Sequence, residues 1–194
     1  MAQVIDHFEI KTNKVLGKGG YGSVFEATDT KTQKLVAAKR ILLETEPGSE
    51  RSRIILEADL HQNLAPSPNI VRYLHHSLND TFLWIFLEFC DQGDLTNYAG
   101  REDGLSLSDK LEVMLNISSG IDHMHQSKIS HKDIKPSNIL FTSRERNIAK
   151  LCDFGISNLI EKCEGSTKGF TTKAGTEAFM APEQFAHRDC RDER

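Results

Sequence analysis

The sequence of 194 residues contains no run of apolar residues long enough to span a bilayer. Its first ten residues, MAQVIDHFEI, include acidic side chains and lack the long apolar core of a secretory signal peptide. The sequence has four cysteines, scattered without a Cys-x-x-Cys pair, which suits a reducing compartment. We therefore expect an intracellular protein, in the cytoplasm or the nucleus, with no membrane partner.

The sequence also lacks a large excess of charge of either sign. It has 24 Lys and Arg against 28 Asp and Glu, for a net charge of -4, which gives no reason to expect a nucleic-acid partner. No Cys/His cluster accompanies the pairs His75–His76 and His123–His125, so we interpret these histidines as solvated or packed rather than as metal ligands. Hydrophobic residues make up 38% of the chain, which is enough for a core.

The first half of the chain alternates between strand-like runs and turns. Residues 8–42 and 69–90 favour strands, and a helical stretch at 51–65 ends at the sequence PSPN. From Ser106 onward the apolar residues recur at helical spacing, and Ser106 with Asp109 fits an N-terminal helix cap. The sequence therefore predicts an α+β protein with a β-rich first part and a helix-led second part.

A glycine-rich bend lies between two strand-like runs, with Gly17, Gly19 and Gly22 followed by Val24. Glycines let a backbone approach a phosphate closely. A plain hairpin turn would also explain them, and a dinucleotide-binding fold would require a helix directly after the glycines. Because SVFEATD is strand-like, we interpret the bend as a hairpin lid over phosphates, with Val24 above a flat base.

Lys39 ends the apolar strand VAAK and could place its ammonium below this lid, although an exposed strand lysine is an equal alternative. A charge in such a place needs a partner. Glu57, in the helix that follows, is the best candidate for that partner.

The stretch SHKDIKPSNILF combines three kinds of polar group on one short loop. Asp133 could accept a proton from a hydroxyl, and Lys135 offers a positive charge to a phosphoryl group. Asn138 and, further along, Asp153 supply the hard oxygen ligands that Mg²⁺ prefers. Phosphoryl transfer depends mostly on positioning and charge stabilisation, and these residue types supply both.

With these motifs in this order, and with APE at 181–183, the chain resembles a eukaryotic protein kinase catalytic domain over about Phe8 to Phe185. The sequence DIKPSN resembles the Ser/Thr branch of the family. The resemblance implies a bilobal fold, with an ATP-binding N-lobe at 1–92 and a partial, mainly helical C-lobe at 93–194 truncated after APE. It also implies ATP and Mg²⁺ as cofactors and transfer of the ATP γ-phosphoryl group to Ser or Thr hydroxyls of a protein substrate.

The same resemblance implies a role for each matching residue. Gly17, Gly19 and Gly22 would cover the phosphates of the nucleotide, and Asp94 would contact its ribose. The adenine would lie between Val24, Ala37 and Leu140, with Leu87 as the gatekeeper. The backbone of Glu88 and Cys90 would form hydrogen bonds with the adenine edge. At the reaction centre, Lys39 would pair with Glu57 and hold the α- and β-phosphates, while Asn138 and Asp153 would hold Mg²⁺. Asp133 would be the base, and Thr176 would bridge Asp133 and Lys135.

The sequence departs from the family pattern at three points. Lys132 replaces an arginine whose fork often clasps a phosphate, so control by an upstream kinase acting on Thr171 or Thr172 would be looser. His61 occupies a position that is usually apolar, unless the helix register makes Leu60 the equivalent residue. The helices that normally follow APE are absent, so we expect one side of the helix at 107–125 to be exposed. The alternative to an enzyme is therefore a non-catalytic fragment that binds a nucleotide or a partner.

Overall fold

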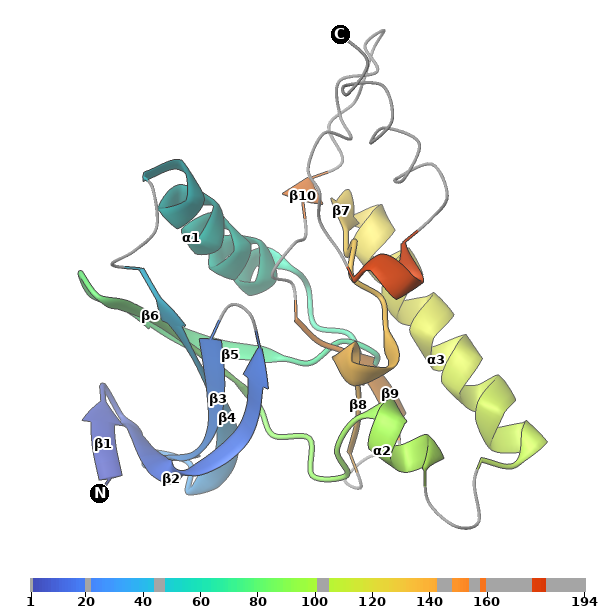
Figure 1. Ribbon diagram of the computed structural model, residues 1–194, viewed down its shortest axis with the longest axis horizontal. Helices are drawn as coiled ribbons and strands as arrows, with labels where there is room; N and C mark the ends of the chain where they lie inside the picture. The colour runs from blue at the N-terminus through green and yellow to red at the C-terminus, as the bar shows by residue number, and fades with distance from the viewer. Residues whose placement is uncertain are drawn as a thin grey trace, which may run out of the picture.

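The computed structural model describes residues 2–19, 22–43, 48–100, 105–142, 148–153, 158–159 and 176–180. Their arrangement is α+β, as predicted, with a β-sheet lobe and a second, smaller lobe beside it (Figure 1). Within the described residues, no helix is long and apolar enough to cross a membrane.

The first lobe is built on a six-stranded sheet with strand order β1-β2-β3-β4-β6-β5, in which all neighbouring strands are antiparallel. The strands are β1 Ala2–Ile5, β2 Phe8–Gly19, β3 Gly22–Asp29, β4 Lys34–Leu42, β5 Tyr73–Leu78 and β6 Phe82–Glu88. Strand β1 was not expected from the sequence, whereas the hairpin of β2 and β3 around the glycines confirms the prediction of strands rather than a helix after the bend.

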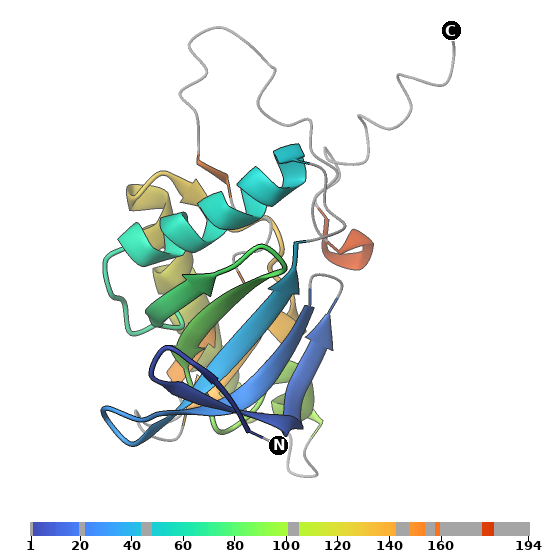
Figure 2. The same ribbon diagram turned by 90° about the vertical axis from the view of Figure 1, so that its left-hand side faces the viewer.

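Helix α1, Gly48–Asn63, lies across one face of this sheet (Figure 2). Side chains on a strand alternate between its two faces. Ile41 of β4 and Leu43, directly after β4, pack with Ile54 and Ala58 of α1, whereas Ala38 of β4 packs in the separate cluster on the opposite face. Lys39 has the same parity as Ile41, so the alternation directs Lys39 to the face that α1 covers.

The second lobe contains α2 Leu95–Ala99, α3 Leu107–Gln126, β7 Ile129–Ser130, the 3₁₀ helix η1 Pro136–Asn138, β8 Ile139–Thr142, β9 Ile148–Leu151, β10 Asn158–Leu159 and the 3₁₀ helix η4 Glu177–Phe179. The predicted cap of α3 is confirmed: the Ser106 hydroxyl accepts the Asp109 N–H, and the Asp109 carboxylate accepts the Ser106 N–H. Two of the apolar residues spaced along α3 point inward, since Met124 is buried and Ile121 packs against the same core.

The other side of α3 is exposed, as the sequence predicts. Leu107, Leu111, Met114 and Leu115 are exposed by 74%, 53%, 63% and 68% of their surface. The covered side faces β9, and at Gly120 the contact is too close for a side chain, because an added Cβ would lie 2.8 Å from the carbonyl oxygen of Asn69.

The hairpin of β8 and β9 joins the two lobes. Leu151 of β9 exchanges backbone hydrogen bonds with the segment before β5, accepting from the Val71 N–H at 2.8 Å and donating to the Asn69 carbonyl at 2.9 Å. On β8, Phe141 accepts from the Gln92 N–H at 3.1 Å and donates to the Gly93 carbonyl at 2.9 Å. Residues 89–94, which we call the linker because they connect β6 to α2, are therefore fixed to the second lobe.

Candidate active site

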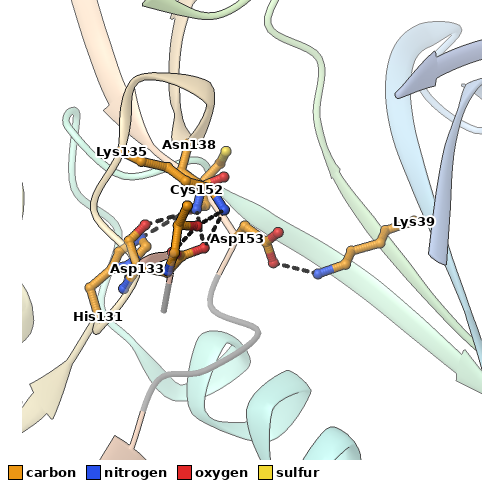
Figure 3. Close-up of polar contacts among 8 residues, drawn as sticks. Lys39, His131, Asp133, Lys135, Asn138, Cys152 and Asp153 are labelled. Carbon is orange, nitrogen blue, oxygen red and sulfur yellow. Dashed lines mark hydrogen bonds and ion pairs between the residues drawn. The ribbon is translucent and has the colours of Figure 1, made fainter. Parts of the chain in front are cut away.

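The loop between β7 and η1 is fixed by the buried imidazole of His131. Its Nδ1 accepts the Asp133 N–H at 3.3 Å, so the ring proton lies on Nε2, which donates to the Cys152 carbonyl at 3.0 Å. Burial lowers the pKa of His131, and the ring is therefore neutral at neutral pH. This histidine thus joins the loop of Asp133 to the segment of Asp153 (Figure 3).

The carboxylate of Asp133 is surrounded by donors. Its Oδ1 accepts from the backbone N–H and the hydroxyl of Thr176, both at 2.9 Å, and its Oδ2 lies 2.7 Å from the Lys135 ammonium. The same ammonium donates to the Thr176 hydroxyl oxygen at 2.6 Å. Thr176 therefore bridges Asp133 and Lys135 although it lies about forty residues along the chain.

These contacts set the charge of the carboxylate. Burial alone would raise the pKa of Asp133, but the hydrogen bonds from Lys135 and Thr176 and the charge of the lysine outweigh burial and lower the pKa below its ordinary value. Asp133 is therefore ionised at neutral pH, as an acceptor of a hydroxyl proton must be.

Asn138 lies next to Asp133 and is buried. Its side-chain nitrogen donates to the Asp133 carbonyl at 2.8 Å and to the Asp133 Oδ2 at 3.0 Å. Because the nitrogen makes both bonds, the oxygen of the amide is the atom that can act as a metal ligand. The backbone of the following segment is bonded as well, since Cys152 donates its N–H to the Asn138 carbonyl at 3.0 Å.

Lys39 reaches this centre from the other lobe. Its ammonium lies 2.6 Å from Oδ1 of Asp153, and the lysine side chain is exposed by only 11% (Figure 3). Asp153 has φ of 63°, in the left-handed region that aspartate tolerates better than most side chains. The candidate phosphate-binding cation and a candidate metal ligand are therefore neighbours.

The donor set fits Mg²⁺. Within the described part of the chain, no group of three or more His, Cys, Asp or Glu could hold a metal ion by itself. One carboxylate, Asp153, and one amide oxygen, Asn138, are nevertheless a normal protein contribution for Mg²⁺, which takes its remaining oxygen ligands from phosphates and water.

The apolar residues expected around an adenine lie on neighbouring strands. Val24 of β3 is paired with Lys39 of β4, and Ala37 of β4 is paired with Leu87 of β6. Leu140 of β8 approaches from the second lobe, where it forms a bridge with Asp94. Val24, Ala37, Leu87 and Leu140 are all half-buried, so each keeps some surface available for contact.

The three glycines differ in what surrounds them. A side chain at Gly17 would meet nothing within 4 Å. At Gly22, φ is +150° and an added Cβ would lie 1.9 Å from the Arg40 carbonyl oxygen, so Gly22 is required by the packing of the hairpin on β4. Gly19 ends β2 and is paired with Gly22.

Other residues expected in the site have the following positions. Asp94 is the N-cap of α2, where its Oδ1 accepts the Asn97 N–H at 2.8 Å. Glu88 and Cys90 lie at the end of β6 and in the linker. Glu57 lies in α1, but its side chain falls outside the described part of the structure, so the pair with Lys39 stays a prediction. Thr171, Thr172 and the APE motif also lie outside the described residues.

His61 and Leu60, the two residues considered for the position that is usually apolar, are both buried, and they pack in different places. His61 makes a hydrogen bond of 2.8 Å with the Val71 carbonyl and an edge-on contact with the Tyr73 ring. Leu60 belongs to the core of the second lobe. Burial lowers the pKa of His61 to about 4. His61 therefore occupies this buried position as an uncharged imidazole at neutral pH.

Two other residues near the centre, His131 and Lys150, were given no role from the sequence, whereas Cys152 was expected to line the nucleotide pocket or to act as a small apolar filler. His131 aligns the loop, the buried Lys150 pairs with Glu88, and Cys152 lies between Asn138 and Asp153 in the contact network. Burial raises the pKa of the Cys152 thiol, which therefore stays protonated. The position of His131 directly before Lys132-Asp133 was visible in the sequence, but the partner of Lys150 depends on tertiary structure.

Comparisons with known proteins agree with this geometry. The sequence profile of the family described as "Protein kinase domain" matches residues 10–193. The chain is 34% identical over 177 residues to mouse "Serine/threonine-protein kinase Nek5", covering 90% of this chain and 27% of that protein. It is 37% identical over 170 residues to "Serine/threonine-protein kinase 1" of Arabidopsis thaliana, covering 87% of this chain and 19% of that protein.

A third relative is "Mitogen-activated protein kinase kinase kinase A" of Dictyostelium discoideum. It is 33% identical over 188 residues, which cover 93% of this chain and 19% of that protein. The chain thus spans between 19% and 27% of the length of these three relatives.

Proposed function

The chain belongs to the protein kinase family, and on that premise we propose that it transfers the γ-phosphoryl group of ATP to serine or threonine hydroxyls of proteins. The observation that carries this proposal is the network of Asp133, Lys135 and Thr176, in which one ionised carboxylate is held by an ammonium and a hydroxyl. Two of the relatives are named as serine/threonine-protein kinases, which supports serine and threonine as the hydroxyls that accept the phosphoryl group.

Asp133 would orient the substrate hydroxyl and accept its proton as the hydroxyl oxygen attacks the γ-phosphorus, while the bond from the γ-phosphorus to the β-phosphate oxygen breaks and ADP leaves with that bond's electron pair. Its lowered pKa makes it a weak base, so its main contribution is to align the hydroxyl and to take up the proton late in the step. Lys135 would contact the transferring phosphoryl oxygens while it also holds Asp133. Thr176 fixes the carboxylate from the other side.

Lys39 would bind the α- and β-phosphate oxygens, with Glu57 as its partner. Asn138 and Asp153 would hold Mg²⁺, which when bound neutralises charge on the phosphate oxygens. The Lys39–Asp153 contact supports this assignment, because the two groups that must act on the same triphosphate already lie together.

The adenine would lie between Val24, Ala37 and Leu140, with Leu87 behind it as the gatekeeper and Asp94 near the ribose. The backbone of Glu88 and Cys90 would bind the adenine edge. Gly17, Gly19 and Gly22 would cover the phosphates as part of the β2–β3 hairpin. Three of the four adenine-site side chains lie on the adjacent strands β3, β4 and β6, which supports a single binding surface for a flat base.

Control of the enzyme would come from an upstream kinase acting on Thr171 or Thr172. Lys132 would supply charge to the added phosphate, but a lysine cannot form the two parallel bonds of an arginine fork. The scattered cysteines and the mild net charge support a location in the cytoplasm and give no support to a nucleic-acid or membrane partner.

A second candidate is a module that binds a nucleotide or a partner without turnover. The exposed apolar side of α3, where Leu107 and Leu115 are exposed by 74% and 68% of their surface, favours it, because an exposed apolar face of this kind is typical of a surface that binds a partner. The two candidates differ in chemistry rather than in nucleotide binding.

The test uses the purified chain with Mg²⁺, ATP labelled in the γ-phosphoryl group, and a mixture of unstructured proteins rich in Ser, Thr and Tyr. Label recovered on phosphoserine or phosphothreonine supports the kinase. Binding of ATP and Mg²⁺ without transfer supports the module, and label confined to phosphotyrosine would contradict the proposed substrate class.

A further inference from the structure

The beginning of the linker is held by the carboxylate of Glu88, the last residue of β6. The Glu88 N–H donates to the Arg72 carbonyl at 2.9 Å. The Arg72 N–H in turn donates to Oε1 of Glu88 at 2.7 Å. Backbone and side chain of Glu88 therefore bind the same residue, which lies directly before β5.

The same carboxylate oxygen also binds a lysine from the other lobe. The ammonium of Lys150 lies 3.0 Å from Oε1 of Glu88, and the lysine side chain is exposed by only 4%. Lys150 lies in β9 opposite Leu140 of β8. Burial of an ammonium is costly unless it is paired, so this lysine is held in place by its acceptors.

The far end of the linker is bound by β8. Phe141 accepts from the Gln92 N–H and donates to the Gly93 carbonyl. The chain is thus fixed to the β8–β9 hairpin on both sides of the linker's first residues: at Glu88, directly before the linker, through a side-chain ion pair with β9, and at Gln92 and Gly93 through backbone bonds with β8. The two groups proposed above to bind adenine, the Glu88 carbonyl and the Cys90 N–H, belong to this fixed stretch.

We propose that Lys150 and the Glu88 carboxylate are positioning residues: they hold the start of the linker so that the backbone groups of Glu88 and Cys90 face the adenine edge. The inference rests on the proposed nucleotide site. Neither charged group would touch the nucleotide itself. They act because a carboxylate shared by Arg72 and Lys150 fixes the direction of the Glu88 peptide, and because the same hairpin supplies Leu140 to the adenine site.

The test compares three ligands on the full chain: Mg²⁺–ATP, adenosine, and Mg²⁺–tripolyphosphate, which lacks the adenine. Lys150→Met removes the charge at similar volume. We expect its dissociation constants for ATP and adenosine to rise roughly tenfold, because a misplaced binding group forfeits the benefit of orientation, while the constant for tripolyphosphate stays unchanged. Lys150→Arg, which keeps the charge, restores most of the loss. Lys110→Met, an exposed change in α3, serves as the matched control.

Each outcome is decisive. Equal affinity of wild type and Lys150→Met for ATP and adenosine overturns the inference, and so does an equal loss for all three ligands, which would indicate a general loss of structure. If Lys150→Met does not fold, the same comparison on Glu88→Gln decides in its place. Absence of ATP binding by the wild-type chain would instead overturn the proposed function, so the two failures are distinguished.

Discussion

The ammonium of Lys39 lies 2.6 Å from a carboxylate oxygen of Asp153, although the two residues are separated by 114 positions and belong to different lobes. The contact places the proposed phosphate-binding cation beside a proposed metal ligand. It depends on two local features: the alternation of β4, which turns Lys39 to the face covered by α1, and the left-handed backbone at Asp153.

The first prediction separates the roles of these two residues. Asp153→Asn should remove most of the dependence of ATP affinity on Mg²⁺, because it takes away the one anionic oxygen ligand that the chain offers to the metal. Lys39→Met should weaken ATP with and without Mg²⁺, by roughly tenfold or more, since it removes a charge-assisted contact. Calorimetric titration of each variant with ATP, once in the presence of Mg²⁺ and once in the presence of a chelator, measures both effects. Lys34→Met, an exposed change on the same strand, is the control, and identical behaviour of the two site variants would contradict the assignment.

The second prediction concerns the bridge between Asp133 and Lys135. Thr176→Val removes the hydroxyl, and we expect the rate of transfer to fall by about tenfold to a hundredfold, because hydrogen bonds to charged groups are among the stronger ones. Thr176→Ser retains the hydroxyl and should stay close to wild type. A rate for Thr176→Val equal to that of Thr176→Ser would show that the hydroxyl has no part in the reaction.

The same variant predicts a change in pH dependence. Hydrogen bonds from Lys135 and Thr176 lower the pKa of Asp133, so loss of the Thr176 hydroxyl should raise that pKa. Because the base must be ionised, activity is lost as the pH falls through this pKa, and the acid limb of the pH–rate profile should move to higher pH. A profile that moves to lower pH would contradict the account.

The third prediction follows from the buried ring of His61. Its pKa is about 4 in the folded chain, against about 6.5 when exposed, so the unfolded chain binds more protons between these values. Folding stability should therefore fall as the pH is lowered through this window, with His61 contributing at most roughly 3 kcal/mol. The nearby charge of Lys39 acts in the same direction as burial.

Urea titrations between pH 4 and 7 test this. His61→Gln keeps a donor for the Val71 carbonyl but does not titrate, so its stability should depend less on pH, with a remaining slope from His131. Equal slopes for wild type and His61→Gln would indicate that the ring is not buried in solution.

The fourth prediction concerns the exposed side of α3. Replacing Leu107 and Leu115 by Gln should reduce self-association and change the free energy of unfolding by less than about 0.5 kcal/mol, because both residues are mostly exposed. Met124→Ala on the buried side should cost about 2–5 kcal/mol. Sedimentation velocity and urea titration measure the two effects. A large loss of stability in the Leu variants would mean that this side is covered in solution.

The residues that could be identified from the sequence share one property: each belongs to a short local pattern. The loop of Asp133 and Asn138, the lysine that ends VAAK and the Ser106 cap are visible within a few positions. The side chains that the sequence did not assign depend on contacts between distant segments. Nothing near Lys150 in the sequence indicates that its partner is Glu88, 62 positions away.

Two further elements illustrate the same limit. Strand β1 is only four residues long and pairs with the start of β2, and so short a segment carries little periodicity. Gly22 was interpreted through phosphate approach, but its closest contact is the Arg40 carbonyl on the neighbouring strand. The phosphate-covering role of Gly22 stays a prediction, and the packing gives a separate reason for a glycine at this position.

The most direct test of the central claim compares phosphoryl transfer by the wild-type chain and by Asp133→Asn, with Asp122→Asn on the exposed surface of α3 as the matched control. We predict that Asp133→Asn lowers the transfer rate by at least about a hundredfold while ATP and Mg²⁺ bind with nearly the wild-type affinity, and that Asp122→Asn changes neither. Equal transfer by wild type and Asp133→Asn would contradict the assignment of this carboxylate.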